Sequence, residues 1–241
     1  MKKSIAIICF IVVQITLAFA EAPSHKAFTR LLKKHVSSEG LVNYKGFWAD
    51  SVALTAYLET LRTNPPDKSW TSDEQIAFWI NAYNAFTIKL ILKYYPIKSI
   101  KDIGSSIQIP FVNTPWDIKF IRIGKDRLDL NNIEHGILRK RFKDPRIHMA
   151  LVCASKSCPV LLDEAYEPSK LDTQLTQQSK AFLADKSRNQ VSSTNPKVSM
   201  IFKWYAMDFD NVREFINRYS ATKINPKSEI EYLDYDWSLN E

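Results

Sequence analysis

Two cysteines, Cys153 and Cys158, are the residues of this chain best suited to covalent chemistry. A cysteine acts as a nucleophile through its thiolate, and a neighbouring imidazole or cationic group lowers the thiol pKa so that the thiolate forms. Cys153 ends an apolar segment and begins a polar turn, a position from which a side chain can reach the floor of a pocket. The nucleophilic hypothesis therefore depends on which of the four histidines lies near Cys153.

His135 is the histidine that we expect to serve Cys153. His148 belongs to the segment from Arg146 to Cys153, which alternates like a buried strand. Side chains five residues apart on a strand point to opposite faces, which separates His148 from Cys153. His135 comes from the preceding predicted helix and has no such conflict. With Cys153 as nucleophile and His135 as base, the predicted reaction is hydrolysis or group transfer at an amide or ester.

Other polar residues are assigned to the same predicted site. Glu134 or Asn81 would orient the base or stabilise charge, and the residues expected to contact the substrate are Asn84, Arg139, Arg146, His148 and Cys158. Each assignment has a structural alternative. Glu134 could cap its helix, the two asparagines could hydrogen-bond the backbone of a neighbouring loop, and the arginines could form ordinary ion pairs.

The two cysteines could instead form a disulfide, because a turn across the four intervening residues can bring their Cα atoms to about 5.5 Å. Such a bond would be structural, or it would exchange with a partner thiol. The spacing is wider than the two-residue gap of thioredoxin-like motifs. A further alternative is a zinc or copper site that uses both thiolates with His135 or His148. The preferred hypothesis requires no metal and no cofactor.

A binding protein without catalysis is the remaining alternative. Aromatic side chains could line a groove for a glycan or peptide, although residues of this kind are more often part of a core. The candidates are Trp48, Trp79, Trp116, Trp204, Tyr205, Tyr235 and Trp237.

Four stretches, in this order, resemble the domain of unknown function family 547. They are residues 78–86 (FWINAYNAF), 130–139 (LNNIEHGILR), 144–159 (DPRIHMALVCASKSCP) and 233–237 (LDYDW). The resemblance is close over about residues 70–180 and implies an uncharacterised activity, so it supplies no mechanism. The family pattern usually has glycine after the first cysteine, where this chain has Ala154. The turn at that position should therefore be less free to adopt positive φ.

The elements that position these residues are helices and short strands. A helix that is apolar nearly all round is expected from Thr71 to about Tyr95, with Thr71 and Glu74 as its capping box, and it should be buried in the middle of the fold. A hairpin follows over residues 116–123 and 127–130. Asn131 should then cap another helix, with Glu134 in the third position as a second capping box.

The remaining segments complete an α+β fold. Further helical segments are expected at residues 24–61, with an interruption at about 37–45, and at 169–184 and 210–219. A hairpin across residues 193–197 is expected to have its second strand at 198–205. His25 and His35, in the first of these segments, are expected at the surface. We therefore predict one domain over residues 21–241, in which the long buried helix packs against a small sheet of hairpins and surrounding helices.

Composition limits the classes of partner. The chain of 241 residues is 45% hydrophobic and carries a net charge of +7, without the clustered Lys and Arg of a nucleic-acid-binding surface. Five glycines leave no Gly-rich phosphate loop. The expected partner is a small molecule or a peptide, and no nucleic acid.

The first twenty residues are typical of a secretory signal. Lys2 and Lys3 precede an apolar run that ends in Ala18-Phe19-Ala20, so cleavage is expected before Glu21. The run is short for a membrane span, and we expect no stable membrane insertion after cleavage. These features predict a protein that is periplasmic or secreted.

Overall fold

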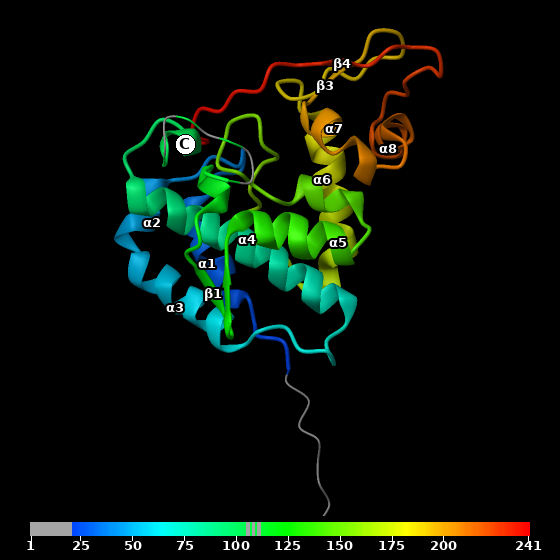
Figure 1. Cartoon of the computed structure of the whole chain (residues 1–241). Coiled ribbons are helices and arrows are strands. Elements are labelled where there is room, and N and C mark those ends of the chain that lie inside the picture. The colour runs from blue at the N-terminus through cyan, green and yellow to red at the C-terminus, as the bar shows by residue number, and fades with distance from the viewer. Residues whose placement is uncertain (1–20, 105–106, 108, 110–111) are drawn as a thin grey trace, which may run out of the picture.

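The centre of the structure is α4 (Ser72–Tyr94), a helix of 23 residues that is buried along nearly its whole length. This computed structural model describes residues 21–104, 107, 109 and 112–241, so the predicted signal lies outside the described residues. The Thr71 side chain accepts from the Glu74 amide, and the Glu74 carboxylate accepts from the Thr71 amide. The predicted helix and its capping box are therefore confirmed, and Figure 1 shows α4 crossing the middle of the molecule.

Shorter helices surround α4, and the predicted helical segments at residues 24–61, 169–184 and 210–219 are confirmed. Figure 1 places α2 and α3 to one side of α4, and α6, α7 and α8 to the other. The bounds are α1 (Lys26–His35), α2 (Tyr44–Ala49), α3 (Ser51–Thr63), α5 (Arg139–Arg141), α6 (Leu171–Ala184), α7 (Ile201–Trp204) and α8 (Val212–Tyr219).

The strands are short and form two separate pairs, which makes the fold α+β. The predicted hairpin is present but shorter than expected, with β1 (Ile121–Ile123) antiparallel to β2 (Asp126–Leu128). β3 (Lys197–Val198) pairs in parallel with β4 (Glu231–Tyr232). The strand predicted over residues 198–205 is wrong beyond Val198. Ser199 Oγ accepts from the Ile201 amide and begins a turn that leads into α7.

Two clusters of apolar side chains form the interior. The central cluster surrounds α4 and includes the buried faces of α1 and α3. The C-terminal cluster combines residues of α6, α7 and α8 with Met149: Phe182, Leu183, Val198, Ile201, Phe202, Phe209, Phe215, Ile216 and Ile224. The candidate site is lined by residues that belong to or pack against both clusters.

His25 and His35 are buried, so their predicted surface positions are wrong. His25 Nδ1 lies 2.8 Å from the Tyr57 hydroxyl of α3. His35 Nε2 lies 2.7 Å from a carboxylate oxygen of Asp50. These partners compensate the loss of water that would otherwise keep an imidazole at the surface.

The C-terminal segment returns from β4 to the opposite side of the molecule, as the red trace in Figure 1 shows. Near its end Leu239 bridges to Ser155, and the Asn240 amide donates to the Ala154 carbonyl at 3.2 Å. The Tyr44 hydroxyl donates to Asn240 Oδ1 at 2.7 Å. The last residues of the chain therefore fix the loop that carries both cysteines.

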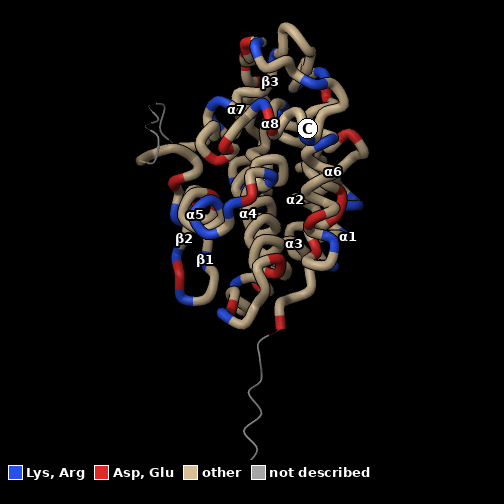
Figure 2. Tube along the Cα trace, turned by 90° about the vertical axis from the view of Figure 1, so that its right-hand side faces the viewer, with Lys and Arg blue, Asp and Glu red and all other residues tan. Residues whose placement is uncertain are grey.

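Charged residues of both signs occur along the chain, and Figure 2 shows Lys and Arg interspersed with Asp and Glu. Within the described ranges, no helix combines the length and the apolarity needed to cross a membrane.

Candidate functional site

Cys153 and Cys158 form a disulfide, with their Cα atoms 6.2 Å apart. The turn between them closes through a hydrogen bond of 3.1 Å from the Cys158 amide to the Ser155 carbonyl. Ala154 adopts a φ of 62°, so this turn takes the left-handed conformation although its residue is not glycine. An L-residue with a Cβ atom pays about 1 kcal/mol or more for that conformation.

The backbone before Cys153 is paired with a side chain and not with a strand. Asn84 Nδ2 donates to the Ala150 carbonyl at 2.9 Å, and the Val152 amide donates to Asn84 Oδ1 at 2.9 Å. The amide of Asn84 thus replaces the neighbouring strand that this segment lacks. The predicted strand from Arg146 to Cys153 is wrong.

A 3₁₀ helix over Pro145–Met149 occupies the first part of that segment. Proline fixes a helical φ at the first position, and the Asp144 side chain accepts from the Arg146 amide as a cap. The argument that placed His148 and Cys153 on opposite faces of a strand therefore fails. Both residues line the same pocket.

This pocket has a volume of about 680 Å³, its open mouth included. It lies against the disulfide, and aromatic rings from four separate parts of the sequence form much of its wall. Its lining residues are Tyr83, Trp116, Asn131, Glu134, His135, His148, Leu151, Cys153, Cys158, Ile201, Trp204, Tyr205, Tyr235 and Trp237. A concave, largely aromatic lining with a few polar groups is typical of small-molecule sites.

Hydrogen-bond donors lie close to both sulfurs of the disulfide. The Cys153 amide donates to Cys158 Sγ at 2.9 Å, the Tyr235 hydroxyl lies 3.3 Å from each sulfur, and Ser155 Oγ lies 3.1 Å from Cys153 Sγ. Ser155 Oγ in turn donates to the Tyr235 oxygen at 3.2 Å. Burial and the nearby Glu134 raise the pKa of Tyr235, so its hydroxyl keeps its proton and remains a donor.

Glu134 is buried in the pocket wall, on a π-helical segment over Asn132–Leu138. Its carboxylate interacts with the hydroxyls of Tyr83 and Tyr205. Burial, and then the contact with Glu134, raises the pKa of both phenols. A π-helical segment often marks a functional site.

The predicted capping box at Asn131 and Glu134 is wrong. Asn131 already has helical dihedral angles, and its side chain makes no cap hydrogen bond. The start lies two residues earlier, where Asp129 Oδ1 accepts from the Asn132 amide at 2.6 Å and Asn132 Oδ1 accepts from the Asp129 amide at 3.2 Å. Glu134 is therefore available to the pocket.

A network of charged residues lies behind His135. Arg139 binds Asp208 through two guanidinium nitrogens, and Arg139 Nη1 lies 2.7 Å from His135 Nδ1. Arginine can only donate, so Nδ1 of His135 is the acceptor and a neutral ring carries its proton on Nε2. Burial, opposed by Glu134 and supported by Arg139, lowers the pKa of His135.

Asp208 joins this network to the second histidine. His148 Nε2 donates to Asp208 Oδ2 at 2.7 Å, and the His148 ring stacks on Tyr205 with centroids 4.1 Å apart. Burial opposes the ionisation of Asp208, but the hydrogen bonds from His148 and Arg139 outweigh it and hold the pKa of that carboxyl well below its usual range. Asp208 was not predicted, because nothing in its local sequence distinguishes it from a surface aspartate.

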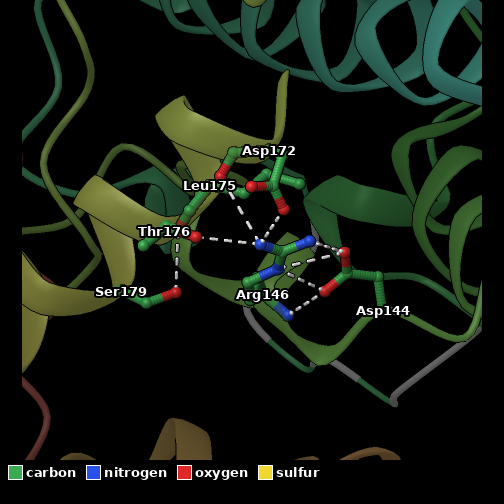
Figure 3. A network of polar contacts seen from close by, with 6 residues as sticks. All are labelled: Asp144, Arg146, Asp172, Leu175, Thr176 and Ser179. Carbon is green, nitrogen blue, oxygen red and sulfur yellow. Dashed lines mark hydrogen bonds and ion pairs between the residues drawn. The ribbon is translucent and has the colours of Figure 1, made fainter. Parts of the chain in front are cut away.

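Four predicted site residues do not line the pocket: Arg139, which lies behind His135, and Asn81, Asn84 and Arg146. Asn81 Nδ2 donates to the Tyr166 carbonyl at 2.8 Å and Asn81 Oδ1 accepts from the Tyr166 amide, while Asn84 pairs with the segment before Cys153. The structural alternative for both asparagines is therefore the one observed. Figure 3 shows Arg146 between Asp144 and Asp172 and in contact with Thr176.

The aromatic residues divide between the pocket and other surroundings. Trp79 is buried in the central cluster, and Trp48 is 62% exposed on α2. The other five candidates for an aromatic groove all line the pocket, and Tyr83 of α4 joins them. Tyr83 was missed because its neighbours on α4 are apolar and signal only burial.

The alternative of a metal site lacks its thiolate ligands here, because both sulfurs are in the disulfide. Among the residues that the structure describes, no group of three or more His, Cys, Asp or Glu is placed to hold a metal ion.

Comparison with known proteins identifies one family. Residues 68–183 match the family described as "Protein of unknown function, DUF547", which confirms the resemblance seen in the sequence. No curated protein and no solved structure matches.

Proposed function

We propose that this chain, whose residues 68–183 carry the DUF547 domain, is an exported thiol–disulfide exchange protein with Cys153–Cys158 as its redox-active pair. The observation that carries the proposal is the asymmetry of the disulfide within the pocket. Cys153 is half-buried, whereas Cys158 is 3% exposed and its sulfur accepts from the Cys153 amide. Exchange requires one accessible sulfur and one sulfur that leaves easily as a thiolate.

The reaction begins at Cys153. A substrate thiolate attacks Cys153 Sγ, the bond between the two cysteines breaks, and its electron pair leaves on Cys158 Sγ. The Cys153 amide and the Tyr235 hydroxyl stabilise the negative charge that develops on Cys158. A second substrate thiolate then attacks the substrate sulfur of the mixed disulfide and releases Cys153. Two substrate thiols are oxidised to one disulfide, and their two protons finish on the cysteines.

Single-cysteine variants test this assignment. Cys158→Ser should form a mixed disulfide rapidly with the chromogenic disulfide DTNB, and Cys153→Ser should react at least ~10-fold more slowly because its remaining thiol is buried. The oxidised wild-type protein should also equilibrate with reduced and oxidised glutathione while folded. A disulfide that resists glutathione until the protein is unfolded would be structural, and the proposal would then be wrong.

A second candidate is a thiol-dependent hydrolase or transferase that acts on an amide or ester after reduction of the pair. The observation that favours it is that Cys153, His135 and Glu134 line one pocket. The hydrogen bond from Arg139 leaves the proton of neutral His135 on Nε2, so this ring is arranged as a donor toward developing charge. To act as a base, neutral His135 would have to accept a proton at Nδ1, which already accepts from Arg139. The hydrolase or transferase is therefore the second candidate.

The reduced protein separates the two candidates. A cysteine nucleophile should give a burst of nitrophenolate from p-nitrophenyl acetate, with an acyl group retained on Cys153 in the intact mass. Cys153→Ser should abolish both the burst and any later turnover. Turnover that survives this substitution would end the hydrolase hypothesis, whereas the exchange proposal would be unaffected.

Export is part of the same proposal. The positive start, apolar run and Ala-Phe-Ala ending of the first twenty residues support a secretory route. A disulfide is more readily maintained outside the reducing cytosol. Expression of the full chain, followed by N-terminal sequencing of the product, should give Glu21 as the first residue; an intact Met1 would contradict cleavage.

A further inference from the structure

We propose that the aromatic wall and Glu134 together form a binding site for an organic ammonium group, so that the preferred exchange partners are thiols that also carry an amine. The binding site stands on the geometry of the pocket alone. The choice of thiol rests on the proposed function.

The wall is a contiguous set of rings at one side of the disulfide. The ring centroids of Tyr235 and Trp237 are 4.6 Å apart, those of Trp204 and Tyr235 4.8 Å, and those of Trp116 and Trp237 5.8 Å. Trp204 is 45% exposed although it lies in this cluster. An exposed indole beside these half-buried rings offers aromatic surface to whatever enters the pocket, and a cation over the face of such a ring is stabilised.

The charge of the pocket also favours a cation. Glu134 is the carboxylate among the described lining residues, and neither lysine nor arginine lines the pocket with it. Glu134 interacts with the neutral hydroxyls of Tyr83 and Tyr205, and the nearby Arg139 directs its hydrogen-bond donors to Asp208 and His135. A carboxylate can accept about four hydrogen bonds, so Glu134 retains acceptor capacity for an ammonium group.

Two cations of the chain lie over rings that line the pocket. Lys101 Nζ is 4.8 Å from the centroid of the Trp237 ring, and Arg139 Cζ is 5.0 Å from that of the Tyr205 ring. The Lys101 contact shows that the chain itself places an ammonium group on one of these rings.

A matched pair of ligands without a thiol tests the site independently of exchange. Choline and 3,3-dimethylbutan-1-ol have nearly the same shape and differ in the positive charge. Titrated into the oxidised protein and followed by tryptophan fluorescence and by NMR, choline should bind at least ~5-fold more tightly. Equal affinities, or no binding of either ligand, would overturn the proposal.

Substitutions in the pocket test whether Glu134 and Trp204 cause the preference for choline over 3,3-dimethylbutan-1-ol. Glu134→Gln and, separately, Trp204→Ala should each reduce the ratio of the two affinities toward one. Trp204 is partly exposed, so its replacement keeps the test valid if Glu134→Gln does not fold. Glu229→Gln and Trp48→Ala remove an exposed carboxylate and an exposed indole outside the pocket, and both should leave the ratio unchanged. A preference for choline that survives both pocket substitutions would place the cation elsewhere and refute the assignment.

The choice of thiol is tested with cysteamine and 2-mercaptoethanol. With rates expressed per thiolate, cysteamine should reduce the oxidised protein faster than 2-mercaptoethanol, and Glu134→Gln should remove the difference. If choline binds but the two thiols react equally, the amine-bearing substrate class is wrong. If neither thiol reacts, the exchange proposal fails and the ammonium site remains supported by choline binding.

Discussion

Buried polar side chains on α4 and on the π-helical segment Asn132–Leu138 serve different purposes. On α4, Asn81 and Asn84 each bind one donor and one acceptor of a neighbouring backbone segment. On the π-helical segment, Glu134 and His135 are held by side chains and line a pocket. Glu134 is nearly as buried as the two asparagines and His135 is half-buried, yet the polar groups of α4 bind backbone and those of the π-helical segment line a pocket.

The difference follows from chemistry and local geometry. A primary amide has one donor group and one acceptor group, which match the carbonyl and amide of a nearby backbone segment. A carboxylate only accepts, and a neutral imidazole has one donor and one acceptor at fixed positions. Glu134 and His135 therefore need hydroxyl, guanidinium or ligand partners, and the irregular helix brings them to the place where Tyr205 and Arg139 supply these.

Removing one amide from α4 should give the largest effect. Asn84→Ala and Asn81→Ala each leave a buried carbonyl and a buried amide without their partner, so each should lower the free energy of unfolding by about 3 kcal/mol. Urea denaturation measures this loss. Only Asn84 holds the backbone beside Cys153, so only Asn84→Ala should also change the rate of DTNB exchange measured in the Cys158→Ser background. Equal changes in exchange rate for the two variants would remove the distinction between them.

His25 is buried outside the pocket lining, and it provides a pH-dependent test of a polar group that serves structure alone. Burial lowers the pKa of His25 from 6.5 to about 4. The unfolded chain takes up the proton first as the pH falls, so the stability due to neutral His25 is complete above about pH 6.5 and is lost toward pH 4. Between pH 7 and 4.5 the wild type should lose about 2.5 kcal/mol more than His25→Gln.

Urea denaturation at the two pH values measures that difference, and parallel pH dependences of wild type and variant would show that His25 does not titrate as described. Exchange provides the control. His25 lies outside the pocket lining, so the pH profile of DTNB exchange in the Cys158→Ser background should be the same with and without His25→Gln.

Local sequence predicts α4 well and the pocket only in part. The apolar run and the capping box of α4 are contained in neighbouring residues, so its bounds could be read directly. The segment before Cys153 was assigned to a strand because its apolar pattern signals burial. Its actual partner is the side chain of Asn84, which no local pattern reveals.

Long-range contacts explain the other differences between the site predicted from the sequence and the site observed in the structure. Tyr235 reaches the cysteines from about eighty residues further along the chain, and Asp208 joins His148 and Arg139 from sixty or more residues away. Cys153, Cys158, Glu134, His135 and His148 were proposed from sequence and lie in one pocket, but their roles remain predictions. The aromatic residues could be identified from the sequence as candidates for lining a groove. The path of the C-terminal segment determines which of them come together, and this path could not be predicted.

The ion-pair networks of Arg139 and Arg146 extend the comparison between residues beside the pocket and residues that serve structure. Arg139→Gln removes a positive neighbour of His135, so the pKa of His135 should rise, which NMR titration of the four histidines can follow. Arg146→Gln disrupts the network of Figure 3, none of whose six residues lines the pocket. That variant should cost about 1 kcal/mol in stability and leave the titration of His135 unchanged. A shift of His135 in Arg146→Gln would show that the two networks are coupled.

Ala154 and Ala150 allow the smallest effect to be measured, that of the turn beside Cys153. Both side chains are 1% exposed, but Ala154 has a φ of 62° and Ala150 a φ of −110°. Glycine at either position loses a buried methyl group and gains freedom in the unfolded chain, and only at position 154 does it also relieve the left-handed conformation. Ala154→Gly should therefore be more stable than Ala150→Gly by about 1 kcal/mol in urea denaturation. Equal stabilities would mean that the turn carries no conformational cost, and the departure of this chain from the family's glycine would then be neutral.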